Sequence, residues 1–267
     1  PPVLSAILKQ RSTELSRGVV AHAMDIVAGS AICMGSQNFV APAYLSNPIG
    51  ITVEGSNTMT RSLLIFGQGV VRSHPHLLDI MNSIESNDKK SFSTAVMSTT
   101  SDFLGLLCTL TSTKTPLEQY VNFFALSSNA SLLLGGDLKR REFLSGRYAD
   151  LLSGIVAGFA MEWHGKNENV DPVFLRGCQG DLLHRLDTAA RDLVRNHPHR
   201  TLHRALYLKS VSWLPRHPAT DEDRAHASAL LTTAGSSLRD LFSRDTLSMH
   251  PNVKRIEQAL ETDDPRL

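Results

Sequence analysis

Residues 3–27 read VLSAILKQRSTELSRGVVAHAMDIV, and the spacing of their apolar side chains is what first indicates the fold. The side chains that recur on one face of a helix with 3.6 residues per turn are Leu4, Leu8, Leu15, Val19, Ala23 and Ile26. Gly29 follows as a helix stop signal. The stretch therefore predicts one long amphipathic helix.

Helical spacing continues along most of the remaining chain. Further helices are predicted near residues 57–74, 76–85, 90–112, 116–134, 138–164, 172–196, 200–213, 221–234 and 252–261. Proline or glycine marks most of the gaps between them, and no sustained strand-like alternation occurs. We therefore expect an all-α fold, an antiparallel helical bundle continued by a second helical region. Residues 29–55, which are rich in Gly, Pro, Asn and Ser, are expected to be irregular.

Composition limits the classes of function. The 267 residues are 42% hydrophobic and 20% charged, which is typical of a globular protein, and the net charge of +1 gives no reason to expect a nucleic-acid partner. The three cysteines are odd in number and form no C-x-x-C pair, so we expect reduced thiols in an intracellular compartment. The start of the chain carries no signal-peptide pattern, and we expect no membrane-spanning helix.

One isolated carboxylate stands out in the stretch ITVEGSNTMTRS (51–62). Glu54 follows 28 uncharged residues, from Ile26 to Val53, and precedes a glycine at a predicted turn. Burial at such a turn raises the pKa of a carboxyl group, and a general base for a carbon acid needs that property at neutral pH. The alternative is an exposed glutamate favoured by the dipole of the next helix. Both interpretations remain open from the residues alone.

The histidines and the glycines are two further groups of candidate site residues. His197, His199 and His203 lie close in sequence, but no HEXXH pattern exists and arginines surround them, so we expect solvated surface histidines and no metal site. Gly67 and Gly69, in FGQG (66–69), lie inside a helical pattern, where glycine permits close packing of another helix.

Basic residues gather in the segment 185–217, which has a net charge of +5. Within it, residues 200–214 interleave apolar side chains with Arg204 and Lys209, a pattern that suits an anionic membrane surface. The same pattern is typical of a helix that packs on a neighbour and keeps a charged outer side. We favour the packed helix.

Two long motifs carry a resemblance to a known family. PIGITVEGSNTMTRSLLIFGQGVVRSHP (48–75) closely resembles the segment around the catalytic glutamate of acyl-CoA dehydrogenases. GGDLKRREFLSGRYADLLSG (135–154) resembles a characteristic stretch of the extra C-terminal region in the long, bacterial-type (FadE-like) branch of that family. VVAHAMDIVAGSAICMG (19–35) is also similar to the family.

The resemblance implies a flavin-dependent desaturation of fatty acyl-CoA, as in fatty acid β-oxidation, with long chains as substrates. Glu54 would remove the α-proton of the thioester, the β-hydrogen would leave as hydride to FAD, and trans-2-enoyl-CoA would form. Gly55 would lie at the substrate, and Ser56 and Thr58 at the cofactor. The family's Gly-Gly-x-Gly, which approaches the FAD of a neighbouring subunit, corresponds to Ala28–Ala31. There Gly29 is retained and two of the three glycines are alanines.

The resemblance also implies an organisation and partners. Residues 1–86 would be the latter part of the catalytic C-terminal helical domain, and residues 87–267 a helical extension. The family's β-domain is absent from this chain, so we expect the chain alone to be inactive. An electron-transfer flavoprotein would accept the electrons, and a homo-oligomer is expected, with peripheral membrane contact through 200–214 as a hypothesis. The compartment would be the cytoplasm, at the periphery of the inner membrane in a bacterium, or the mitochondrion in a eukaryote. The alternatives are an acyl-CoA oxidase of the same fold, or a non-catalytic helical assembly module that keeps Glu54 as a relic.

Overall fold

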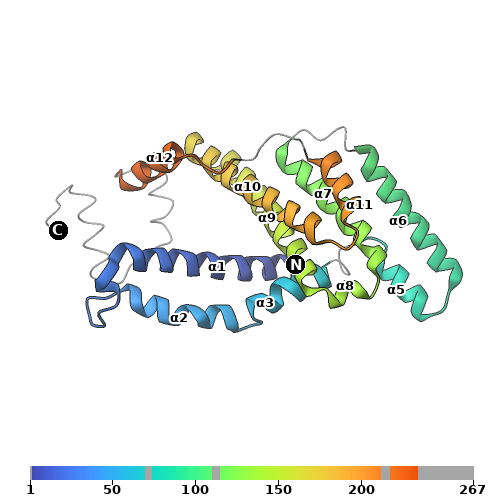
Figure 1. The fold of residues 1–267 in the computed structure, drawn as a ribbon, viewed down its shortest axis with the longest axis horizontal. Helices are drawn as coiled ribbons and strands as arrows, with labels where there is room; N and C mark the ends of the chain where they lie inside the picture. The colour runs from blue at the N-terminus through green and yellow to red at the C-terminus, as the bar shows by residue number, and fades with distance from the viewer. Residues whose placement is uncertain (1, 70–73, 110–114, 212–216, 234–267) are drawn as a thin grey trace. The chain divides into compact units, whose positions relative to one another are not determined.

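The computed structural model describes residues 2–69, 74–109, 115–211 and 217–233, and within these residues it contains helices and turns but no strand (Figure 1). The predicted all-α fold is confirmed. The predicted helix at 252–261 lies outside the described residues.

The long predicted helices are present, with ends shifted by a few residues. The elements are α1 (Pro2–Val27), η1 (Ala28–Ala31), α2 (Val40–Thr52), α3 (Asn57–Met59), η2 (Thr60–Gln68), α5 (Leu77–Glu85), α6 (Lys89–Thr109), α7 (Pro116–Ser131), η4 (Leu132–Leu134), α8 (Asp137–Arg140), α9 (Glu142–Asn167), α10 (Pro172–Asn196), α11 (Arg200–Ser210) and α12 (Asp221–Thr232).

Two compact units divide the chain, and several helices contribute to both. Unit 1 contains residues 1–9, 57–159 and 182–217, and unit 2 contains residues 10–56, 160–181 and 218–267. Each unit draws residues from both sides of position 86. The expected boundary between residues 1–86 and 87–267 therefore stays a prediction.

Unit 1 has its core between α7, α9 and the last turns of α10. α7 begins with a full capping box, because the Thr115 side chain accepts from the Glu118 amide and the Glu118 side chain accepts from the Thr115 amide. The helix predicted near 116–134 is present, and one side of α7 is buried although its sequence is rich in polar residues. The fully buried large side chains of this core are Tyr120, Phe123, Leu126, Tyr148, Leu151, Leu186 and Leu193.

Small residues allow the helices of this core to approach closely. A methyl group added to Gly154 would lie 2.6 Å from a Leu186 methyl carbon, and one added to Gly158 would lie 2.6 Å from a Leu117 methyl carbon. Gly69, expected to permit close packing, is buried, and a Cβ there would lie 3.2 Å from a Val3 methyl carbon. Glycine at these positions therefore sets the distances between the helices.

Unit 2 contains most of α1, the turn after it, and α2. The two helices run antiparallel and side by side in Figure 1, and a Cβ added to Gly50 would contact the Thr13 methyl group at 3.5 Å. The helix predicted from residue 3 to 27 is confirmed. Most of its periodic apolar side chains are nevertheless exposed, from 39% at Leu4 to 83% at Ile26.

The prediction that residues 29–55 are irregular is wrong for their second half, because Val40–Thr52 is helical. Pro42 lies in the first turn, where no backbone donor is needed, and Asn38 Oδ1 accepts from the Val40 and Ala41 amides at 3.0 and 2.9 Å. Pro48 lies inside the helix and removes only one of its hydrogen bonds. The number of prolines is a poor guide to this segment, because the position of a proline in a helix decides whether the proline breaks it.

The helix predicted at 57–74 begins where expected, but Thr60–Gln68 winds as a π-helix. π-Helical turns are rare in proteins, and those that do occur are often found at functional sites. Thr60, Ser62, Ile65 and Phe66 are its buried residues. The segment that follows Glu54 thus has an uncommon backbone that is packed into unit 1.

Candidate functional site

Glu54 lies in a tight left-handed turn directly after α2. The backbone leaves the helix at Val53, whose amide still donates to the Ile49 carbonyl at 3.0 Å. Glu54 has φ 56° and Gly55 has φ 89°. The left-handed region costs a residue with a side chain roughly 1–2 kcal/mol, and such outliers cluster at functional sites. The turn is therefore a structural reason to examine Glu54.

The carboxylate of Glu54 is exposed, and apolar side chains surround its position in the sequence. Along the second half of α2, Leu45 is 63% exposed and Ile49 is 60% exposed, and Val53 beyond the helix is 49% exposed. The uncharged segment 26–53 leads up to Glu54. Within the described residues this segment supplies apolar side chains but leaves them uncovered.

The other residues expected at the site lie on both sides of the same turn. Gly55 and Ser56 are half-buried and belong to unit 2, like Glu54. Thr58 is exposed and belongs to α3 in unit 1, where its carbonyl accepts from the Ser62 hydroxyl at 2.8 Å. The chain thus continues directly from the glutamate into the π-helix.

Gly29 lies at the opposite end of α2, in the turn that joins α1 to α2. With 13 residues, α2 is roughly 20 Å long, so Gly29 and Glu54 are separated by about that distance along the helix. Gly29 is exposed, and a Cβ added there would meet no atom within 4 Å. The structure of unit 2 does not bring these two residues together.

The alanines that flank Gly29 differ in orientation and backbone. Ala31 is only 1% exposed, so its methyl group does not project where another molecule would approach. Ala28 is exposed and has φ 54°, a backbone conformation that favours glycine. Of the two alanines that stand where the family has glycine, only Ala28 therefore adds a methyl group to the exposed surface of the turn.

Asn38 holds this turn together, and the sequence interpretation did not single it out. Its Nδ2 lies 3.1, 2.6 and 3.2 Å from the carbonyl oxygens of Ser30, Ala31 and Cys33. Its Oδ1 accepts from the first amides of α2. The position of Asn two residues before an apolar helix is a helix-start signal that could have revealed it.

The expectation of solvated surface histidines is wrong for two of the three. His197 is 3% exposed and His203 is fully buried, whereas His199 is exposed. The imidazole rings of His197 and His203 stack with centroids 3.4 Å apart. The residues could not be recognised as buried because the sequence around them is basic and polar.

The two buried imidazoles belong to a closed polar cluster with Ser127, Ser131 and Tyr148. The Tyr148 hydroxyl lies 2.7 Å from the Ser127 hydroxyl and 3.2 Å from His203 Nε2, and it also contacts the Ser131 hydroxyl. The Ser131 hydroxyl lies 3.1 Å from His197 Nε2. Every polar side chain of the cluster thus has a partner, as buried polar groups require.

Burial sets the protonation of this cluster. It lowers the pKa of His197 to about 3, with smaller contributions from His203, His199 and Arg141, and it lowers the pKa of His203. Burial also raises the pKa of the Tyr148 hydroxyl well above its usual range. Because these side chains are buried and hydrogen-bonded to one another, the cluster stabilises the packing of α7, α9 and α11 in unit 1.

The basic amphipathic segment packs as the favoured interpretation predicted. α11 contacts α7, and its side chains His203, Leu206, Tyr207 and Ser210 are buried, while Arg204 and Lys209 are exposed. Trp213 and Leu214 lie outside the described residues. The outer face of α11 is the part that a membrane could contact, and that contact stays a prediction.

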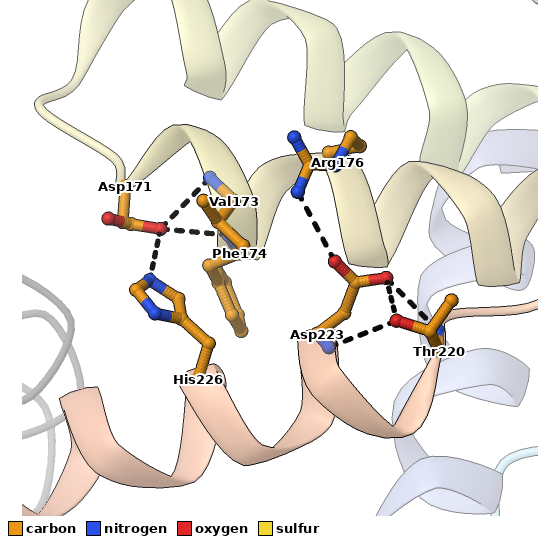
Figure 2. Close-up of polar contacts among 7 residues, drawn as sticks. All are labelled: Asp171, Val173, Phe174, Arg176, Thr220, Asp223 and His226. Atoms are coloured by element: carbon orange, nitrogen blue, oxygen red, sulfur yellow. Dashed lines mark hydrogen bonds and ion pairs between the residues drawn. The ribbon is translucent and has the colours of Figure 1, made fainter.

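In unit 2, a polar network joins the start of α10 to α12 (Figure 2). Asp171 caps α10 by accepting from the Phe174 amide at 2.8 Å, and it also contacts His226 Nε2 at 3.0 Å. Asp223 completes a capping box with Thr220 and contacts Arg176 Nη2 at 3.4 Å.

These hydrogen bonds hold the pKa of both carboxyl groups below the usual range. The largest contribution comes from the Phe174 amide for Asp171 and from the Thr220 amide for Asp223. Because the folded-state pKa is lowered, the network stabilises unit 2 above the ordinary aspartate pKa and loses that contribution as the pH falls through the lowered value.

Two other features are absent from the part of the chain that the structure describes, a metal site and a membrane-spanning helix. Among the described residues, no group of three or more His, Cys, Asp or Glu side chains is arranged to hold a metal ion. None of the helices described here combines the length and the apolar content that crossing a bilayer requires.

Comparison with known proteins gives one family. The model of the family described as "Acyl-CoA dehydrogenase, C-terminal, bacterial type" matches residues 109–263, which is more than half of the chain. The match includes the motif at 135–154 and the polar cluster, and it excludes Glu54 and the turn at Ala28–Ala31. No solved structure matches the chain.

Proposed function

The chain belongs to the acyl-CoA dehydrogenase family, in the class defined by its bacterial-type C-terminal domain, and from this premise we propose that it is the C-terminal part of a flavin-dependent acyl-CoA dehydrogenase. The substrate class that we propose is long-chain fatty acyl-CoA, in the α,β-desaturation step of fatty acid β-oxidation. Glu54 is the proposed general base.

The observation that carries the proposal is the backbone of Glu54 and Gly55. Two consecutive left-handed residues form the turn that directly follows α2, and the sequence there has the Glu-Gly-Ser order of the family's catalytic segment. The left-handed conformation costs a residue with a side chain roughly 1–2 kcal/mol. Residues that are held in such conformations cluster at active sites, which supports a functional role for Glu54.

The chemistry asks three things of this chain. A Glu54 carboxylate oxygen accepts the proton from the α-carbon of the thioester. The Glu54 backbone N–H donates a hydrogen bond to the thioester carbonyl oxygen, which stabilises the negative charge that develops there, and the absence of a side chain at Gly55 leaves room for the substrate. FAD, when bound, supplies the acceptor for the hydride that leaves the β-carbon, and trans-2-enoyl-CoA is the product.

The apolar side chains of α2 and of Val53, directly after it, have a role in the same step. Exclusion of water raises the basicity of a carboxylate and strengthens the hydrogen bond to the carbonyl oxygen. Leu45, Ile49 and Val53 are exposed in this chain and offer an apolar wall that an acyl chain would cover. Covering of these side chains is therefore part of the proposal, and it explains why an uncharged segment precedes the base.

Some of the residues that would hold FAD have the space or the hydroxyl groups that contact with this cofactor requires. Open space at Gly29 allows a close approach of its backbone, and the buried Ala31 methyl group does not obstruct that approach. Ser56 and Thr58 offer hydroxyl groups next to the base. Because Gly29 lies at the far end of α2 from Glu54, we propose that it serves the cofactor of a neighbouring subunit in a homo-oligomer, whereas Ser56 and Thr58 serve the cofactor that faces Glu54.

Reduction of the flavin by palmitoyl-CoA in the full-length protein tests the proposal. The wild-type protein should be yellow and should bleach anaerobically when palmitoyl-CoA is added. Glu54→Gln should stay yellow and should not bleach. Glu85→Gln, which removes an exposed carboxylate at the end of α5, should bleach like the wild type. Bleaching of Glu54→Gln at the wild-type rate would refute the role of Glu54.

The final electron acceptor distinguishes a dehydrogenase from an oxidase of the same fold. An electron-transfer flavoprotein should reoxidise the reduced protein faster than dissolved oxygen does. Rapid oxygen consumption with hydrogen peroxide release would instead assign an oxidase. A cytoplasmic or mitochondrial location, and binding to anionic vesicles through residues 200–214, are further parts of the proposal that fractionation and vesicle flotation test.

A non-catalytic assembly module is the second candidate, and one observation favours it. Large apolar side chains are exposed along α1 and α2, including Val19, Ile26 and Leu45. Such a surface suits contact with another protein. A full-length protein that is colourless and cannot be reconstituted with FAD would support this role over the enzyme.

A further inference from the structure

The π-helix that follows Glu54 is fixed to α9 by a bidentate salt bridge between Arg61 and Asp150 (the fork). Arg61 Nε donates to Asp150 Oδ1 at 2.6 Å, and Arg61 Nη2 donates to Asp150 Oδ2 at 2.5 Å. The two side chains are 34% and 41% exposed, so solvent weakens the ionic attraction. The paired, parallel hydrogen bonds still fix the orientation of the guanidinium group, which a single contact would not.

Gly146 makes room for this fork. It lies one turn before Asp150 on α9 and is buried, and a Cβ added to it would lie 2.6 Å from Arg61 Nη1 and 2.9 Å from Arg61 Cζ. Any side chain at residue 146 would therefore displace the guanidinium group from the surface of α9.

A stack of two aromatic rings also fixes the π-helix to α9. The Phe66 ring stacks on the Tyr148 ring, with centroids 4.2 Å apart and an angle of 9° between the planes. Both rings are at most 1% exposed. The fork at one end of the π-helix and the stack near its other end prevent it from rotating or sliding along α9.

We infer that Asp150 is a positioning residue for the proposed desaturation: through Arg61 it holds the first turn after the catalytic Glu54, including Thr58. This inference rests on the proposed function. Arg61 is the second residue of the π-helix, and the Ser62 hydroxyl next to it bonds the Thr58 carbonyl. Asp150 lies inside the matched family region and Arg61 lies outside it, so the fork joins the C-terminal region to the catalytic segment.

The physical consequence concerns rate more than stability. A displacement of about 1 Å in the groups that surround the reacting atoms can lower a rate by roughly 100-fold. Loss of the fork should therefore slow proton removal even in protein that is saturated with flavin and with substrate. A residue that only stabilised the fold would not separate these quantities.

The test measures the rate of anaerobic flavin bleaching at saturating palmitoyl-CoA in the full-length protein. In protein that is saturated with FAD, Asp150→Asn should lower this rate at least roughly tenfold, with the Kd of palmitoyl-CoA unchanged. Gly146→Ala, which keeps both charges but displaces the guanidinium group, should lower the rate in the same direction. It is also the variant that carries the test if Asp150→Asn does not fold.

Two controls separate positioning from general destabilisation. Asp137→Asn removes an exposed ion pair with Arg140 in α8 and should bleach at the wild-type rate. Ile155→Val removes one buried methyl group from α9 itself and should lower the unfolding temperature without slowing bleaching. Hydrogen exchange gives a readout that needs no cofactor: amides of residues 57–66 should exchange faster in Asp150→Asn than in either control.

The outcomes distinguish this inference from the proposed function. If Glu54→Gln abolishes bleaching while Asp150→Asn and Gly146→Ala bleach at the wild-type rate, the positioning role of Asp150 is overturned and the function of Glu54 stands. If Glu54→Gln bleaches at the wild-type rate, the proposed function fails, and the positioning role fails with it.

Discussion

Mild acid should destabilise unit 1, because His197 is buried in a neutral state. The unfolded chain binds a proton at this residue with an ordinary pKa near 6.5, whereas the folded protein holds the pKa of His197 at about 3. A group whose folded-state pKa is lowered in this way favours the unfolded state as the pH falls below 6.5. Linkage with these two values gives a loss of about 2 kcal/mol in the free energy of unfolding between pH 7 and pH 5.

The choice of pH window separates this effect from acid titration of the carboxylates. Aspartate and glutamate side chains in an unfolded chain titrate near pH 4, so they contribute little above pH 5. His203 is also buried with a lowered pKa and acts in the same direction as His197. The wild-type loss should therefore be at least about 2 kcal/mol.

Equilibrium unfolding in urea, followed by far-ultraviolet circular dichroism at pH 7, 6 and 5, measures the effect. His197→Gln should be less stable at pH 7, because a buried stack and its hydrogen bond to Ser131 are lost, but its stability should fall by about 2 kcal/mol less on acidification. His199→Gln, at an exposed neighbouring position, should keep the wild-type dependence. Equal pH dependence in His197→Gln and the wild type would refute the reasoning.

Three further predictions concern stability. Ala28→Gly should stabilise the protein by about 1 kcal/mol in urea unfolding, because residue 28 has φ 54°; a loss of stability would contradict the assigned turn. Tyr148→Phe should cost about 2 kcal/mol in the same assay, because its hydroxyl joins two serines and an imidazole in the core, and a cost near zero would contradict that network. Thr220→Ala should cost α12 about 1 kcal/mol and speed hydrogen exchange in α12 but not in α7; unchanged exchange in α12 would show that the capping box is unimportant.

The helices were predictable where the periodicity of apolar residues agrees with local signals for the helix ends. α10 matches its predicted range, and α7 begins at the predicted Pro116, because proline at the first helical position and a capping threonine are local signals. The sequence prediction omits α2 because prolines are typical helix breakers, although Asn38 two residues upstream is a helix-start signal. The π-helical winding of Thr60–Gln68 has no local signal in the sequence.

The candidate site was predictable only in part. Glu54 could be selected because it is an isolated charge at a turn, and its left-handed backbone adds a physical reason that the sequence did not contain. The burial of His197 and His203 was not predictable, because it depends on Ser131 and Tyr148, which lie 66 and 55 residues away in the chain. Long-range contacts of this kind decide which polar residues are core and which are surface.

Exchange of the α-protons of palmitoyl-CoA with deuterated solvent tests the central claim most directly, because it reports proton removal independently of the electron acceptor. In the full-length protein, followed by nuclear magnetic resonance, the wild type should exchange these protons, and Glu54→Gln should not exchange them although it still binds FAD and palmitoyl-CoA. Exchange by Glu54→Gln at the wild-type rate would contradict the assignment of Glu54 as the base.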